Sequence, residues 1–97
     1  MTPTTSGSFL VECYSPDPAG EADRLAGRVD RAAEHADGVT AAVVYRGSIA
    51  VPDDEVAMYL FEGPDALVVA AVCRDAGVSP DRIVPIVANL RGGGTHP

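Results

Sequence analysis

Residues 21–36 have the sequence EADRLAGRVDRAAEHA, and this stretch does most to decide the fold. Its apolar side chains recur at spacings of three and four, which places them on about a third of a helical wheel. They are Ala22, Leu25, Ala26, Val29, Ala32, Ala33 and Ala36. Charged side chains occupy most of the remaining positions. The stretch therefore predicts an amphipathic helix that buries one face.

The residues on either side of this stretch predict where the helix begins and ends. Asp17 can accept a hydrogen bond from the first turn, and Pro18 suits the first helical position because its ring presets the backbone angle φ. Gly38 is typical of the residue that follows a helix, where φ is often positive. We therefore expect a helix that starts at Pro18 and stops before Gly38.

Stretches with strand character lie before and after the helix. Before it, residues 9–14 are apolar except for one glutamate. After it, residues 39–46 return to strand character, and residues 47–51 either continue that strand or form a bulge. A proline-led turn at residues 52–55 then precedes residues 56–62, in which both alternating sets of side chains are mostly apolar. That pattern predicts a central strand covered on both faces.

A second helix and a fourth strand complete the pattern. Residues 65–76 predict a helix that is apolar nearly all round, and Gly77 is its natural stop. Residues 82–88 predict a strand. Pro85 lies within that strand and has no N–H to donate, so we expect the strand at a sheet edge or at a bulge.

This order of elements predicts an α+β domain of the ferredoxin-like βαββαβ type. Right-handed crossovers place both helices on one face of a four-stranded antiparallel sheet. We expect the other face to carry Glu12 and Tyr14, with Arg46 from an adjacent strand and one apolar set of the third strand. An open apolar face on a small domain needs a cover. A homodimer with two sheets packed face to face, as in a dimeric α+β barrel, is the economical solution.

Composition limits the classes of partner. The 97 residues allow one domain, which we expect to span residues 9–90 between loose tails at residues 1–8 and 91–97. The net charge of −7 argues against nucleic-acid binding. No apolar run is long enough to span a membrane, and the polar start lacks the basic residues of a signal peptide. We therefore expect a cytoplasmic protein with free thiols at Cys13 and Cys73.

Residues 47–55, GSIAVPDDE, and residues 59–62, YLFE, resemble a bacterial family of unknown function. Residues 10–12, LVE, and residues 76–83, AGVSPDRI, are similar to the same family, and the resemblance covers residues 9–88. The family includes a small actinobacterial nickel-binding protein, and many members are labelled nickel-binding or nickel-responsive. The resemblance implies a dimeric ferredoxin-like fold, with nickel or another divalent metal ion as a ligand.

Candidate metal ligands are few in this chain. Nickel takes imidazole, carboxylate or thiolate donors, and the two histidines, His35 and His96, are far apart in the sequence. The run Asp53, Asp54 and Glu55 is the candidate carboxylate cluster for a divalent cation. The alternative interpretation of this run is a solvated turn.

Glu12 is the candidate catalytic residue. A charge in the middle of a strand is costly unless it is paired or hydrated, and apolar neighbours would raise its pKa toward that of a general base. Tyr14 or Tyr59 could then orient a substrate carbonyl by donating a hydrogen bond. The structural alternatives are an ion pair from Glu12 to Arg46 or Arg82 and tyrosines that pack in a dimer.

Arg46 and Cys13 are the candidate ligand contacts, and three functions stay open. The first is a homodimeric binding protein that holds a metal ion or a small molecule at the open sheet face. The second is a small cofactor-independent enzyme of the dimeric α+β barrel type, similar to polyketide cyclases or monooxygenases. The third is a structural or regulatory partner without a ligand.

Overall fold

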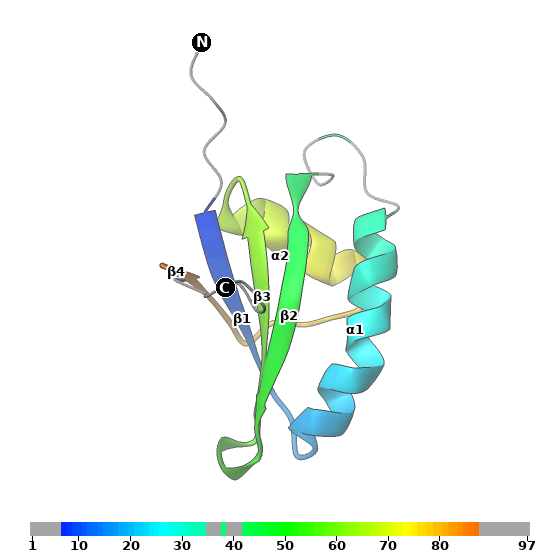
Figure 1. Cartoon of the computed structure of the whole chain (residues 1–97), viewed down its shortest axis with the longest axis vertical. Helices are drawn as coiled ribbons and strands as arrows, with labels where there is room; N and C mark the ends of the chain where they lie inside the picture. Colours follow the sequence, from blue (N-terminus) through cyan, green and yellow to red (C-terminus); the bar gives the residue numbers. More distant parts are fainter. Residues whose placement is uncertain (1–6, 35–37, 39–41, 88–97) are drawn as a thin grey trace, which may run out of the picture.

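The computed structural model describes residues 7–34, 38 and 42–87, and it has the predicted order of elements (Figure 1). The elements are β1 (Gly7–Tyr14), α1 (Pro18–Glu34), β2 (Val44–Val51), the short 3₁₀ turn η2 (Pro52–Asp54), β3 (Val56–Gly63), α2 (Ala66–Asp75) and β4 (Arg82–Ile86). They form a four-stranded antiparallel sheet with two helices. The predicted ferredoxin-like α+β architecture is confirmed.

The boundaries differ from the predictions at both ends of the sheet. Gly7 and Ser8 belong to β1, where they pair with Gly63 and Glu62, rather than to a tail over residues 1–8. β4 ends at Ile86 instead of reaching residue 88. The predicted last turn of the first helix (residues 35–36), the predicted start of the second strand (residues 39–41) and the predicted tail at 91–97 lie outside the described residues.

The strand order in the sheet is β2-β3-β1-β4, so β1 and β3 are central and β2 and β4 are the edges. The edge position of β4 confirms the prediction made from Pro85, which lies opposite Phe9 of β1. β3 lies between β2 and β1, as its apolar sequence predicts. The two central strands therefore carry most of the contacts that hold the sheet together.

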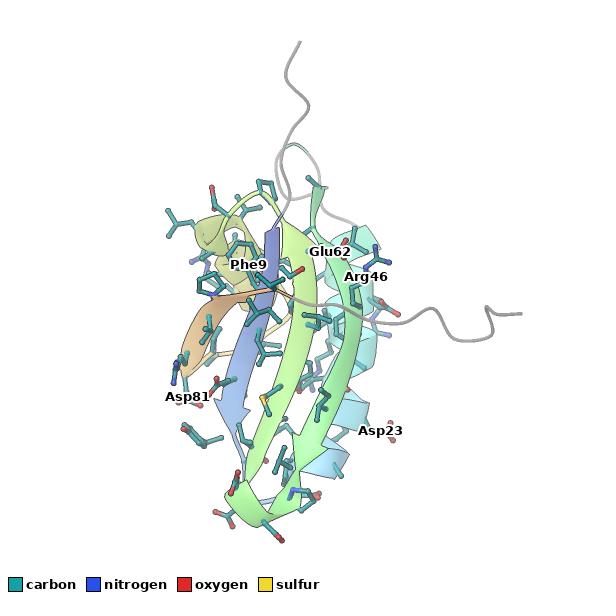
Figure 2. All side chains as sticks on the ribbon, turned by 60° about the vertical axis from the view of Figure 1, so that its left-hand side comes forward. Phe9, Asp23, Arg46, Glu62 and Asp81 are labelled. Atoms are coloured by element: carbon teal, nitrogen blue, oxygen red, sulfur yellow. The ribbon has the colours of Figure 1, made fainter. Side chains whose placement is uncertain are left out.

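One face of the sheet and both helices enclose the core. Val11 of β1, Tyr59 and Phe61 of β3, and Val29 of α1 are buried there. The inner side of α2 adds the buried Val69, Val72 and Cys73. Figure 2 shows the sheet from its other side, with both helices behind it. The second apolar set of β3 therefore faces away from the helices, and we call that side of the sheet the open face.

Both helices begin at an aspartate, and the sequence predicts the cap at Asp17. The Val68 N–H donates to Oδ1 of Asp65 over 2.9 Å at the start of α2, and the Gly20 N–H donates to Oδ1 of Asp17 over 3.3 Å at the start of α1. Gly77 follows α2 with a φ of 76°, a left-handed conformation that suits glycine. Neither described helix is long and apolar enough to cross a membrane.

A bulge interrupts β2. The pairing with β3 shifts between Tyr45 and Gly47, and Gly47 has a φ of 140°, which only glycine adopts easily. The sequence left open whether residues 47–51 continue the strand or form a bulge. In the structure these residues continue β2, and the bulge lies where they begin, between Tyr45 and Gly47. The extra residue is Arg46, and the bulge aims its side chain toward β3.

The buried hydroxyl of Tyr59 generates a stability prediction. This oxygen is buried and has no hydrogen-bond partner in the described part of the chain, and burial raises the pKa of Tyr59 to about 12. An unpaired buried hydroxyl costs about 1–3 kcal/mol, so Tyr59→Phe is expected to raise the free energy of unfolding by about 1 kcal/mol. Urea denaturation measures it.

The matched control is Tyr14→Phe, because the Tyr14 side chain is 66% exposed. Its free energy of unfolding should stay within about 0.5 kcal/mol of the unsubstituted protein. A loss of stability in Tyr59→Phe beyond that margin would show that the hydroxyl has a partner in solution.

Candidate functional site

Strand alternation builds an apolar band across the open face. Leu10 of β1 lies between Leu60 of β3 and Val84 of β4 in the register of the sheet. Met58 of β3 lies opposite Ile49 of β2, whose side chain is 59% exposed. Within the described residues no other element of the chain covers this band.

A shallow depression of about 200 Å³ lies in this band at the β2 side of the sheet. Leu10, Met58, Leu60 and Ile49 supply its apolar wall, and the β2 bulge supplies its polar edge. The full lining is Leu10, Arg46, Gly47, Ser48, Ile49, Met58 and Leu60. Because Gly47 has no side chain, the backbone of β2 forms part of this wall. The depression is suited to an apolar group next to a polar one.

An ion pair lies at the polar edge of this depression. Nη2 of Arg46 is 2.9 Å from Oε1 of Glu62, and the guanidinium donates a hydrogen bond to that oxygen. This hydrogen bond, together with the charge of Glu62, raises the pKa of Arg46. Both side chains are partly exposed, so the pair contributes little to stability. The ion pair places the guanidinium beside the apolar wall.

Glu12 lies on the open face but outside the depression. Its neighbours across the sheet are Met58 on β3 and Arg82 on β4. The prediction of Arg46 as its neighbour is wrong, because Arg46 lies beside Glu62, four residues along β3 from Met58, or about 13 Å. Within the described residues, neither Arg46 nor Arg82 forms an ion pair with Glu12.

The two candidate tyrosines lie on different sides of the sheet. Tyr14 is exposed at the end of β1, and its backbone N–H donates to Oδ2 of Asp81 over 2.8 Å. Tyr59 is fully buried on the helix-covered side, where its ring lies 6.3 Å from that of Tyr45. Tyr59 therefore cannot orient a substrate beside Glu12, and the structure does not bring together the predicted set of Glu12, Tyr14 and Tyr59.

Cys13 is buried on the helix-covered side of β1 and does not join Arg46 on the open face. Burial, followed by the negative charge of Asp81, raises the pKa of the Cys13 thiol to about 11. The thiol therefore stays protonated at neutral pH and is a poor nucleophile or metal ligand. Cys73 is also buried, and burial raises its pKa to about 12.

The acidic run lies at the tip of the hairpin between β2 and β3. Asp53 and Asp54 are exposed in η2, and Glu55 is exposed with a φ of 52°. Across residues 7–34, 38 and 42–87, no three His, Cys, Asp or Glu side chains are grouped so that they could hold a metal ion. The two histidines, His35 and His96, lie outside these residues.

Sequence reasoning found Arg46 but missed its partner and the apolar wall beside it. Glu62 is the last residue of the predicted strand 56–62, and a charge there usually indicates the end of a strand rather than a site. Met58 and Leu60 were assigned to an apolar set without a choice of face. The useful signal was Arg46 followed by Gly47 within a strand, because a glycine there indicates a bulge that redirects the preceding side chain.

A solved structure shares the fold. The crystal structure of SCO4226 from Streptomyces coelicolor A3(2) superposes with a TM-score of 0.66, and the two chains are 18% identical. The superposition covers 86% of this chain and 99% of that chain. No protein-family model matches this sequence, and no curated protein does. At this level of identity the similarity shows the fold alone.

The buried thiols generate a pH prediction. Their pKa values rise from 9.0 to about 11 for Cys13 and about 12 for Cys73, so the folded protein keeps protons that the unfolded chain loses. Stability is therefore complete below pH 9 and falls as the pH rises through these raised values. Urea denaturation in reducing buffer, at pH values below and above 9, measures this fall.

Cys73→Ala should show a smaller loss of stability between neutral and alkaline pH, because one of the shifted groups is gone. Asp54→Asn is the control and should keep the profile of the unsubstituted protein, since Asp54 is exposed. A free energy of unfolding that stays constant up to pH 11 would contradict the assignment of these thiols as buried and protonated.

Proposed function

We propose that the protein is a homodimeric binding module whose two open sheet faces pack together and enclose a small, mainly apolar molecule. The observation that carries this proposal is the apolar depression next to the Arg46–Glu62 ion pair on the side of the sheet without helices. An apolar wall with a few fixed polar groups is the usual composition of a small-molecule site. A second copy supplies the missing cover.

The distribution of charge favours a second copy of the chain as the cover of the open face. The chain carries a net charge of −7, yet the open face has Glu12 and Glu62 balanced by Arg82 and Arg46. The excess negative charge therefore lies elsewhere on the molecule. Two such faces can approach without net repulsion, and a balanced pattern can complement itself across a twofold axis.

The open face is also large enough for a specific dimer interface. Strands about 4.8 Å apart that rise about 3.3 Å per residue give a face of roughly 19 by 26 Å for four strands of up to eight residues. Two such faces bury about 1,000 Å², which is near the lower limit for a specific interface. The dimer would therefore be stable only with good packing, and an enclosed ligand would add to it.

The depression favours a small molecule over a metal ion. Its volume of about 200 Å³ lies below the roughly 300–1,000 Å³ of typical ligand pockets, and two facing depressions would fall within that range. The nickel that the family resemblance implies finds no grouped ligands among the described side chains. Glu12 lies outside the depression, so the arrangement favours binding over acid–base catalysis.

Leu60→Arg tests the dimer. A buried arginine without a partner in the centre of the interface should convert the dimer to a monomer, because an unpaired buried charge costs several kcal/mol. Sedimentation velocity analysis measures the mass. Leu67→Arg is the control, since Leu67 is 82% exposed on α2, on the other side of the molecule. A monomeric unsubstituted protein at all concentrations would refute the dimer.

Met58→Asp tests the ligand site with the fluorescent probe 8-anilinonaphthalene-1-sulfonate, which has apolar rings and one anionic group. The unsubstituted protein should bind the probe saturably, and Met58→Asp should weaken binding at least about tenfold, which corresponds to about 1.4 kcal/mol. Near-ultraviolet circular dichroism checks that the fold is kept. Equal weakening in the control Leu67→Asp, or an absence of saturable binding, would count against the site.

A further inference from the structure

A second cleft lies on the opposite side of the sheet from the depression described above. It has a volume of about 250 Å³ and lies between the end of β1, one side of α1 and the loop from α2 to β4. We call it the α1 cleft. Its lining is Cys13, Tyr14, Glu21, Leu25, Arg28, Gly77, Val78 and Ser79. Unlike the open-face depression, its wall is mainly polar.

Helix spacing aligns one acidic, one apolar and one basic side chain along this cleft. Glu21, Leu25 and Arg28 are four and then three residues apart, so they lie on the same side of α1. The rise of about 1.5 Å per residue separates the backbones of Glu21 and Arg28 by about 10 Å. The cleft therefore presents a carboxylate at one end and a guanidinium at the other, with an apolar side chain between them.

The two charges differ in how they are held. Oε1 of Glu21 accepts a hydrogen bond from Oγ of Ser15 over 3.3 Å, and Ser15 is buried. Arg28 is exposed, and among the described residues it has neither an ion pair nor a hydrogen bond. Arg24, one turn earlier, is already near Asp17 at 3.9 Å. Arg28 is therefore a cation available to a ligand in a chain of excess negative charge.

The wall of the α1 cleft also includes Cys13. The Cys13 thiol in the wall is neutral at physiological pH, so it adds a weak donor without adding charge. Cys13 therefore adds no charge that would compete with Glu21 or Arg28.

We propose that the α1 cleft binds a small linear zwitterion of about the size of a dipeptide, with its carboxylate on Arg28 and its ammonium group on Glu21. A simple anion would meet the repulsion of Glu21, and a simple cation would meet that of Arg28. A molecule that carries both charges several bonds apart satisfies both ends. Leu25 contacts the uncharged middle of such a ligand.

The test uses the full chain and two probes, the dipeptide Ala-Ala and its doubly blocked form N-acetyl-Ala-Ala-amide. Two-dimensional ¹H–¹⁵N NMR of the labelled protein follows each titration. Ala-Ala should shift resonances of the α1 cleft, and the blocked form, which has neither charge, should bind at least about tenfold more weakly. Equal binding of both probes, or shifts confined to the open face, would overturn the proposal.

Variants assign the two charges. Arg28→Gln and Glu21→Gln should each weaken Ala-Ala binding at least about tenfold, whereas Arg28→Lys should retain most of it. Arg24→Gln is the matched control on the same helix and should bind as the unsubstituted protein does. Binding that survives Arg28→Gln, or that is lost equally in Arg24→Gln, would refute the assignment. Leu60→Arg should leave this binding unchanged, which separates this site from the open-face proposal.

Discussion

The structure depends on a central strand, β3, that is apolar on both sides while the helices cover just one of them. Tyr59 and Phe61 project into the helix-covered core and complete it. Met58 and Leu60, which alternate with them, must then project the other way. Within residues 7–34, 38 and 42–87, no further element lies over that side. The same strand therefore supplies the core and the accessible apolar band, and neither can change register without the other.

The bulge in β2 shows how one extra residue changes the chemistry of a sheet face. With regular pairing, side chains would alternate uniformly along the strand edge. The shift between Tyr45 and Gly47 lets Tyr45 pack against Phe61 in the core, with ring centroids 5.4 Å apart, while Arg46 reaches Glu62. A cation paired with Glu62 thus lies beside an apolar wall. This juxtaposition is what distinguishes the depression from an ordinary solvated sheet surface.

The two concave regions of the molecule have opposite chemistry and separate origins. The open-face depression is apolar because strand alternation places Leu10, Met58 and Leu60 side by side. The α1 cleft is polar because a helix presents Glu21 and Arg28 along one side near the end of β1. The sheet separates them, so a ligand in one does not contact the other. A single small domain can in this way offer two independent surfaces for recognition.

The sequence by itself determined the element order, the helix cap at Asp17 and an edge or bulge position for β4, because these follow from local spacing, capping and the missing N–H of Pro85. The sequence did not determine which residues lie together in a site. Pairing between strands distant in the chain decides which alternating set of β3 side chains faces the helices. It therefore also decides that Tyr59 is separated from Glu12. The Arg46–Glu62 pair likewise arises only from register and the bulge, which the tertiary structure alone decides.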